Sequence, residues 1–211
     1  MNPLKICRIK FMFKIYRVIR HRIGIDGEGV TSLVALSGCS LSCKYCLNAR
    51  ILKRGIVYEV SPEALLGDVL RDACYMIATG GGVCFGGGEP LLQYKAIAEF
   101  AKIKPDWMCI TIETSLQVAK EVVLSLLPYV DFWIVDIKTL DAELYRDYTG
   151  GNIYTMLDNL DILSEFALDK CQVRIPIIPN FKDKEIALLE EKEIRKKGFT
   201  NIDVFEYIVR A

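Results

Sequence analysis

The stretch that decides the fold is Cys39-Ser40-Leu41-Ser42-Cys43-Lys44-Tyr45-Cys46. It follows an apolar, β-branched run at 31–36, so a strand ending in the Gly38-Cys39 turn would deliver three thiols together. Cys thiolates hold iron–sulfur clusters, usually with four ligands for a [4Fe–4S] cubane. Only three thiols are offered locally, which would leave one iron open to another ligand. Zinc is the main alternative, although structural zinc prefers four ligands in paired C-x2-C units. An odd group of cysteines in a chain without a secretory signal disfavours a disulfide.

Outward from this loop, apolar runs of β type alternate with segments of helical period. The predicted strands are 31–36, 83–85, 109–113, 132–137, 172–178 and 202–207, and the predicted helices are 62–77, 94–103, 117–126, 153–167 and 184–197. Continuous apolar strands separated by amphipathic helices indicate a parallel sheet that is covered on its outer face. Six such units predict a single α/β domain, a partial (β/α)6 barrel over residues 22–211, preceded by a basic leader at residues 1–21.

Composition narrows the function classes. The 27 Lys and Arg balance 27 Asp and Glu, so no global basic field points to nucleic acid. No apolar run approaches the roughly 18 to 20 residues that span a bilayer, and the cations between Lys5 and Arg22 break up any signal peptide. Such a basic segment can bind a membrane surface, but an early strand with a leader is favoured. We expect a cytoplasmic protein whose remaining five cysteines are small buried side chains: Cys7, Cys74, Cys84, Cys109 and Cys171.

Polar and glycine-rich residues gather where the predicted strands end. They are Gly86-Gly87-Gly88-Glu89, Glu113-Thr114, Asp136-Ile137-Lys138 and Arg174. Because the carboxyl ends of parallel strands meet at one edge of a sheet, these side chains are expected to form one site.

Each group allows a plainer interpretation as well. The glycines let the backbone approach a ligand closely, or make a bend at a barrel corner. Asp136 and Lys138 share one face and either bind a zwitterionic ligand or form a structural ion pair. Glu113 is an edge carboxylate or a ligand to a sugar or a cation, and Arg174 is expected to meet an anion inside the barrel. Acid–base schemes that need histidine have only His21, which lies in the basic segment.

Taken together, these motifs resemble the radical S-adenosylmethionine (radical SAM) enzymes, and among them the activating enzymes of glycyl radical enzymes. The resemblance runs from about Arg22 to Tyr207. The cysteine run, with Tyr45 and Asn48, is typical of the superfamily. More specific to the activating enzymes are Asp26-Gly27-Glu28-Gly29, Tyr148-Thr149-Gly150 and Arg174-Ile175-Pro176.

The resemblance implies a division of labour. Cys39, Cys43 and Cys46 would ligate a [4Fe–4S] cluster whose open iron binds S-adenosylmethionine. The cofactor would be held by Gly87, Gly88 and Glu89 at its amino group and by further residues around it: Tyr45, Asn48, Glu113, Thr114, Asp136, Lys138 and Arg174. Glu113 would in addition line a monovalent-cation site. The reaction would generate a 5′-deoxyadenosyl radical that takes hydrogen from a glycine Cα of a partner protein.

The resemblance also implies two protein partners. Asp26 would face the glycine-bearing loop of a glycyl radical enzyme, and flavodoxin or ferredoxin would supply the electron. Alternative functions are another small radical SAM activity, either activation of an anaerobic ribonucleotide reductase or modification of a small molecule, or a non-catalytic iron–sulfur carrier.

The chain departs from the family pattern at several points. Leu47 replaces a histidine of the cluster motif, and Gly86 replaces a common serine. No cysteine lies between Asn48 and Ser61, so no ferredoxin-like insert is expected there. After strand 202–207 there is no histidine to contact the cofactor, so we expect a site with a wide mouth.

Overall fold

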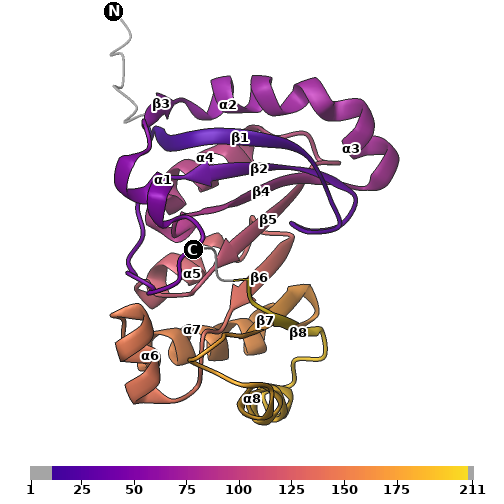
Figure 1. Ribbon diagram of the computed structural model, residues 1–211. Helices are drawn as coiled ribbons and strands as arrows, with labels where there is room; N and C mark the ends of the chain where they lie inside the picture. Colours follow the sequence, from indigo (N-terminus) through magenta and orange to yellow (C-terminus); the bar gives the residue numbers. More distant parts are fainter. Residues whose placement is uncertain (1–10, 209–211) are drawn as a thin grey trace, which may run out of the picture.

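One sheet of eight strands organises the computed structural model, which describes residues 11–208 (Figure 1). The strand order is β3-β1-β2-β4-β5-β6-β7-β8. The strands are β1 (Phe13–Ile23), β2 (Val30–Leu36), β3 (Tyr58–Val60), β4 (Gly82–Gly87), β5 (Cys109–Thr114), β6 (Phe132–Asp136), β7 (Cys171–Ile177) and β8 (Ile202–Glu206). All pairings from β2 through β8 are parallel, whereas β1 pairs antiparallel with both β2 and β3. The predicted partial barrel of six parallel strands is therefore confirmed, with a two-stranded antiparallel extension at one edge.

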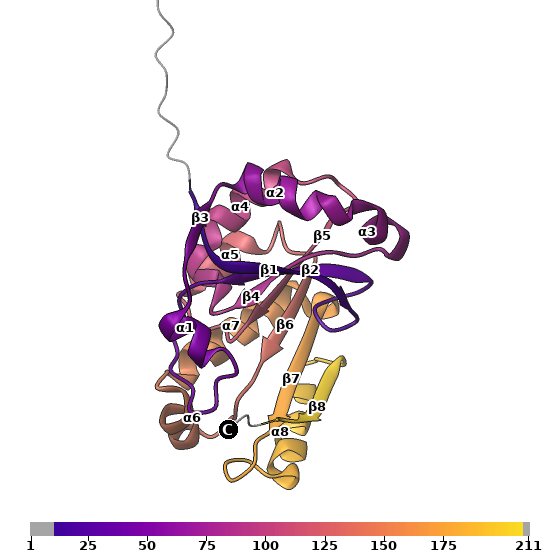
Figure 2. The ribbon, with the colours of Figure 1, turned by 45° about the horizontal axis from the view of Figure 1, so that its top comes forward.

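Helices connect the parallel strands and cover the outer face of the sheet (Figure 2). They are α1 (Ala49–Arg54), α2 (Pro62–Val69), α3 (Ala73–Thr79), α4 (Tyr94–Ile103), α5 (Lys120–Leu126), α6 (Ala142–Thr149), α7 (Ile153–Phe166) and α8 (Lys184–Lys196), with short 3-10 turns at Leu70–Asp72, Pro90–Gln93 and Leu168–Lys170. Between sheet and helices lie fully buried side chains such as Phe85, Phe100 and Trp133. Burying this apolar layer stabilises the fold and leaves the carboxyl ends of the strands free for a site.

Strand β1 accounts for much of the predicted basic leader. It begins at Phe13 and ends at Ile23, so the boundary expected between residues 21 and 22 falls inside it. Phe13 and Ile15 are buried, whereas Lys14 and Arg17 point to solvent. Lys14 and Arg17 therefore lie on the solvent side of β1, whereas Arg20 and Arg22 pair with the buried carboxylates of Asp72 and Asp26. Residues 1–10 lie outside the described part of the chain.

The helix predicted over residues 62–77 is wrong as one continuous element. The structure divides it into α2, a 3-10 turn at Leu70–Asp72, and α3. The break brings the buried Asp72 carboxylate to β1, where it accepts hydrogen bonds from Arg20 and from His21 Nε2 at 2.9 Å. This pairing satisfies a carboxylate that would otherwise be buried and uncompensated.

The cysteines outside the quoted loop follow the prediction in part. Cys84 and Cys171 are buried and Cys109 is partly buried, but Cys74 is exposed, and Cys7 lies outside the described residues. No disulfide joins any pair of cysteines within residues 11–208. In the same part of the chain, none of the helices has the length and apolar character needed to span a bilayer.

Candidate functional site

The loop that carries Cys39, Cys43 and Cys46 follows β2 and is held against the end of β4. Glu89 N donates to Gly38 O at 2.9 Å, and Gly88 N donates to Leu36 O at 3.1 Å. A Cβ on Gly88 would lie 1.9 Å from Gly38 O, which no side chain permits. Glycine is therefore required here because the cysteine loop packs directly on the backbone of residue 88.

Two further contacts fix the middle of the same loop. Ser42 N and Lys44 N donate to the carbonyls of Thr149 and Tyr148 at 2.8 and 2.9 Å, at the end of α6. The Tyr207 hydroxyl, after β8, donates to Tyr45 O at 2.8 Å. The predicted motif at residues 148–150 thus serves as a backbone support for the cysteine loop.

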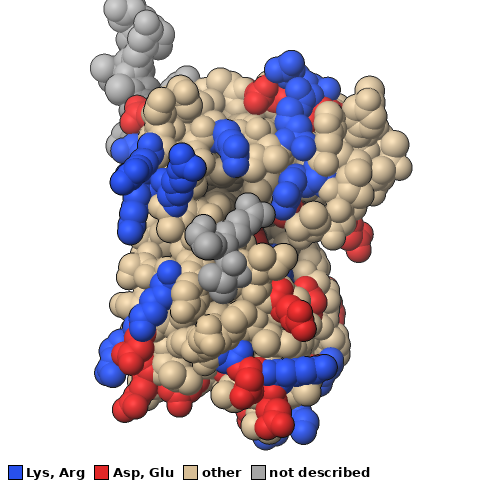
Figure 3. Space-filling model, viewed as in Figure 1, with Lys and Arg blue, Asp and Glu red and all other residues tan. Residues whose placement is uncertain are grey.

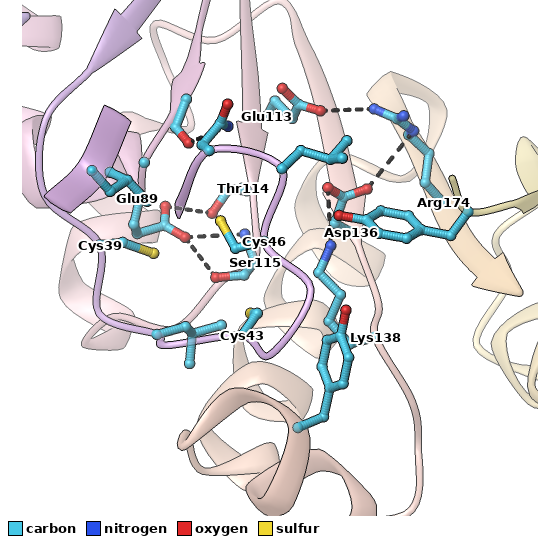
Figure 4. A pocket seen from close by; sticks show the side chains of 18 of the residues that line it. Cys39, Cys43, Cys46, Glu89, Glu113, Thr114, Ser115, Asp136, Lys138 and Arg174 are labelled. Atoms are coloured by element: carbon cyan, nitrogen blue, oxygen red, sulfur yellow. Dashed lines mark hydrogen bonds and ion pairs between the residues drawn. The ribbon is translucent and has the colours of Figure 1, made fainter. Parts of the chain in front are cut away.

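The three cysteines line a cavity of about 360 Å³ at the carboxyl ends of the parallel strands. The thiol loop forms one wall, and the charged side chains of β5, β6 and β7 form the opposite wall (Figure 4). Every residue predicted to bind the cofactor lines this cavity except Tyr45. Tyr45 instead contributes its backbone oxygen, which accepts the hydrogen bond from the Tyr207 hydroxyl. The volume lies within the range of small-molecule sites in proteins.

Glu89 lies in the cavity wall but its carboxylate is already fully hydrogen-bonded. It accepts from the Thr114 hydroxyl at 2.7 Å, from the Ser115 amide and hydroxyl at 3.0 and 2.7 Å, and from Leu91 N at 3.2 Å. Burial raises the pKa of Glu89, while these donors oppose the shift. The side chain therefore joins β4 to β5, and Gly87 and Gly88 line the cavity beside it without a side chain of their own.

Asn48 works on the same strand end from the other side. Its side-chain amide donates to Gly87 O at 2.7 Å, which ties the residue after the cysteine run to β4. Gly87 has φ +93°, a conformation that favours glycine. Asn48 therefore fixes the direction of this peptide group from its own position in the cavity wall.

The opposite wall is a row of alternating charges. Arg174 Nη1 donates to Glu113 Oε1 at 2.7 Å, and Arg174 Nε lies 3.7 Å from Asp136 Oδ1. Asp136 Oδ2 lies 3.4 Å from Lys138 Nζ. The expected anion for Arg174 is thus Glu113. The guanidinium also stacks over the Phe205 ring, 5.1 Å from its centroid.

Burial and neighbouring like charges raise the pKa values of acids and thiols in this cavity. Burial, together with the nearby Asp136 carboxylate, raises the pKa of Glu113 to about 7 although Arg174 opposes this. Burial likewise raises the pKa of Cys43 to about 11 and that of Cys39 above its ordinary value. Lys138 faces the thiols and favours their ionised forms.

The residues fit an iron–sulfur cubane better than a single zinc ion. Within residues 11–208, no three His, Cys, Asp or Glu side chains converge closely enough to hold one ion. A cubane does not need such convergence, because each thiolate binds a different iron. One oxygen, Asp136 Oδ1, is buried without a hydrogen-bond partner and calls for a donor from a ligand.

Asp26 does not reach this cavity. Its side chain is buried, and its two oxygens accept from Arg22 Nε and Nη2 at 2.5 and 3.0 Å. Its predicted contact with a protein partner stays a prediction, since the carboxylate is engaged within the chain. The monovalent-cation site at Glu113 also stays a prediction, and Arg174 already supplies positive charge beside that carboxylate.

The structure adds site residues that the sequence reasoning missed. Ser115 binds Glu89, and the cavity is completed by Tyr148 and by the end of β8 with the residues after it, from Phe205 to Ile208. The serine follows a predicted strand end directly, so its position was a usable signal. The residues after β8 carry no such signal, because an apolar and aromatic run reads as plain strand.

Comparisons with known proteins agree on one family. Residues 33–191 match the family described as Radical SAM superfamily. The (2S)-3-sulfopropanediol dehydratase activating enzyme of Klebsiella oxytoca is 36% identical over 128 residues, which are 59% of this chain and 39% of that protein. The pyruvate formate-lyase-activating enzyme of Clostridium pasteurianum is 29% identical over 189 residues, 87% of this chain and 76% of that one. The crystal structure of Streptococcus suis SuiB bound to S-adenosylmethionine has the same fold, with a TM-score of 0.59 at 16% identity, covering 83% of this chain and 40% of that chain.

Proposed function

We propose that this chain, which belongs to the radical SAM superfamily, activates a glycyl radical enzyme by removing a hydrogen atom from one glycine Cα. The observation that carries the proposal is the cavity in which three thiols face the Asp136–Lys138 pair beside the bare backbone of Gly87 and Gly88. Relatives named as activating enzymes, in Klebsiella oxytoca and Clostridium pasteurianum, support the substrate class.

Members of this superfamily use a [4Fe–4S] cluster and S-adenosylmethionine, and the chain's own residues suit both. Cys39, Cys43 and Cys46 would hold the cluster. The amino and carboxylate groups of the cofactor would meet Gly87 and Gly88 and the pair of Asp136 and Lys138. When bound, cluster and cofactor together supply a one-electron reductive cleavage that yields a species able to abstract hydrogen.

The protein's contribution is orientation, charge and exclusion of water. Glu89 and Asn48 hold the end of β4 in place through their hydrogen bonds to Thr114 and Gly87. Lys138 places a cation between the thiols and Asp136, where it balances thiolates and carboxylate at once. Leu41, Leu52 and Phe205 also line the cavity, and their apolar surfaces would limit the water in it, which strengthens each charge interaction.

The substrate would enter where the cavity is bounded by the residues after β8. A folded glycine loop needs a wide opening, and the edge of the sheet at β8 has no further strand beside it among residues 11–208. We propose a glycyl radical enzyme as the protein that presents this loop, and a flavodoxin or ferredoxin as the source of the electron.

Anaerobic reconstitution followed by incubation with dithionite and S-adenosylmethionine tests the proposal. We expect about four irons per chain in the wild type, a loss of the cluster in Cys43→Ala, and formation of 5′-deoxyadenosine only with the intact loop. A cluster without 5′-deoxyadenosine would favour an iron–sulfur carrier.

The substrate class has its own test. After incubation with a candidate glycyl radical enzyme, we expect an electron paramagnetic resonance doublet on the partner that collapses when its glycine is deuterated. A modified small molecule in place of that doublet would favour another radical SAM activity.

A further inference from the structure

The segment that continues the cysteine loop carries an unusual charge. From Gly29 to Tyr58 the chain has four cations, Lys44, Arg50, Lys53 and Arg54, and no acid, although the whole chain is neutral. All four side chains are exposed, and none forms an ion pair with a carboxylate of residues 11–208. Cations gather over α1 and the adjoining edge of β1, whereas acids and cations are mixed over α6 and α8 at the other end of the molecule (Figure 3). This segment therefore presents positive charge to solvent without an acid of its own.

The same segment leaves large apolar side chains in solvent. Leu47, Ile56 and Tyr58 are 54%, 72% and 55% exposed. Helix α1, which lies between Leu47 and Ile56, has no buried residue. Most helices in proteins are stabilised by packing an apolar face against a core. A six-residue helix that lacks such packing and is flanked by exposed apolar residues is typical of a surface that a partner covers.

This surface is directly continuous with the proposed cluster site. Ala49 N, at the start of α1, donates to Cys46 O at 3.1 Å, and Leu52 of the same helix lines the cavity. The exposed side of α1 thus faces solvent one short helix away from the thiols. An electron crosses between proteins only when the two redox centres lie close together. A protein bound on the exposed side of α1 would lie close to the three thiols.

We propose that Lys44, Arg50, Lys53, Arg54 and Ile56 form a donor surface that docks an acidic protein carrying a one-electron donor. The proposal rests on the proposed function, because only a redox-active site needs such a donor. One electron leaves the donor, which is oxidised by one equivalent, and enters the cluster, which is reduced by one; no covalent bond forms or breaks. Such encounters use small, weakly bound interfaces in which charge complementarity sets the association rate.

The donor rather than the substrate protein fits this surface for a geometric reason. A glycine must physically enter the cavity, so the substrate has to dock over an opening. An electron only has to arrive near the thiols, so its donor can dock on the outward side of a helix whose inner side closes the cavity at Leu52. The four cations lie on the solvent side of that segment.

Charge reversal with two different reductants tests the proposal. In Arg50→Glu/Lys53→Glu, reduction of the reconstituted cluster is followed by its visible absorbance after mixing with a reduced acidic flavodoxin, and separately with dithionite. We expect the second-order rate with flavodoxin to fall at least about 10-fold at low ionic strength. The dithionite rate should be unchanged. Rising salt concentration should lower the rate at which flavodoxin reduces the wild-type cluster but should leave the rate for the variant nearly constant.

The matched control is Lys170→Glu/Lys192→Glu, which changes the net charge equally. Lys170 and Lys192 are exposed and lie in the 3-10 turn before β7 and on α8, across the sheet from α1. Equal loss in this control, or equal loss with both reductants, would overturn the proposal. So would a variant that reduces normally with flavodoxin but no longer forms a glycyl radical with dithionite, because the surface would then bind the substrate protein. Failure of the proposed function shows separately, as wild-type cluster reduction without 5′-deoxyadenosine.

Discussion

Replacing Lys182 by Met should destabilise the protein strongly, because this lysine is one half of a buried ion pair. Its Nζ lies 2.6 Å from Glu190 Oε2, and its side chain has no exposed surface. The other carboxylate oxygen of Glu190 accepts from the Thr139 hydroxyl at 2.6 Å and from Leu140 N at 2.7 Å. In Lys182→Met the carboxylate keeps these two donors but loses its only cation among residues 11–208.

The magnitude follows from leaving that charge uncompensated. Removing one partner of a buried pair costs about 3–5 kcal/mol of unfolding free energy. For a chain of this size, 1 kcal/mol corresponds to about 2–4 °C in Tm. The expected fall in Tm is therefore about 6–20 °C. Because Thr139 and Leu140 directly follow Lys138, loosening them should also weaken binding of S-adenosylmethionine by the variant.

Thermal and urea unfolding of the reduced protein, followed by circular dichroism, measure this cost. Lys184→Met is the control, since Lys184 is exposed and should change stability by no more than about 0.5 kcal/mol. Lys182→Met/Glu190→Gln should be less destabilised than Lys182→Met alone, because the glutamine still accepts from Thr139 and Leu140 without a buried charge. A Lys182→Met variant as stable as the control, or a double variant that loses at least as much as Lys182→Met alone, would refute this reasoning.

Three further predictions concern the cavity. Gly88→Ala should lower the free energy of unfolding by about 1–3 kcal/mol and reduce the iron bound on reconstitution, because the new Cβ would meet Gly38 O. The control is Gly67→Ala in α2, whose Cβ meets nothing within 4 Å and which should raise the free energy of unfolding by about 0.5–1 kcal/mol. The affinity for S-adenosylmethionine, measured by equilibrium dialysis, should rise with pH through about 7 as Glu113 ionises and attracts the sulfonium; Glu113→Gln should remove this step, and an unchanged pH profile would count against the assignment. Tyr207→Phe removes the hydrogen bond to Tyr45 O and should lower the free energy of unfolding by about 0.5–1.5 kcal/mol and alter the electron paramagnetic resonance spectrum of the reduced cluster. Tyr154→Phe, whose ring is exposed, is the control and should change neither.

The architecture was readable from the sequence because its signals are local. Apolar runs bounded by glycine or charged residues gave the six parallel strands to within one or two residues, and α4 was predicted with its observed bounds. The break at Leu70–Asp72 was not readable, since the partners of Asp72 there, Arg20 and His21, lie about fifty residues away in sequence. Helix α6 was missed although Asp141 caps it by accepting from Leu144 N, a signal that its weakly apolar composition hid.

The sequence predicted many of the residues at the site but not the hydrogen bonds between them. Strand-end residues share one edge of a sheet, so those that line the cavity at the ends of β4 to β7 could be named in advance, whereas Tyr148 and the residues from Phe205 to Ile208 could not. Which of these residues face a ligand depends on the register of β4 against β5. The pairing of Phe85 with Ile112 brings Glu89 next to Thr114 and Ser115, whose hydroxyls donate hydrogen bonds to its carboxylate. No property of the Gly-Gly-Glu run by itself distinguishes a carboxylate turned inward from one turned to the cofactor.

The hydrogen bond from Tyr207 to Tyr45 has a consequence for biosynthesis. It joins residues 162 positions apart, and a ribosome adds roughly 5–20 residues per second. The three thiols are therefore translated roughly 8–32 s before Tyr207, whose hydroxyl supports their loop. Throughout that interval the nascent chain presents the cysteine loop without its final neighbour, and the complete cavity first exists after nearly all of the 211 residues have been made.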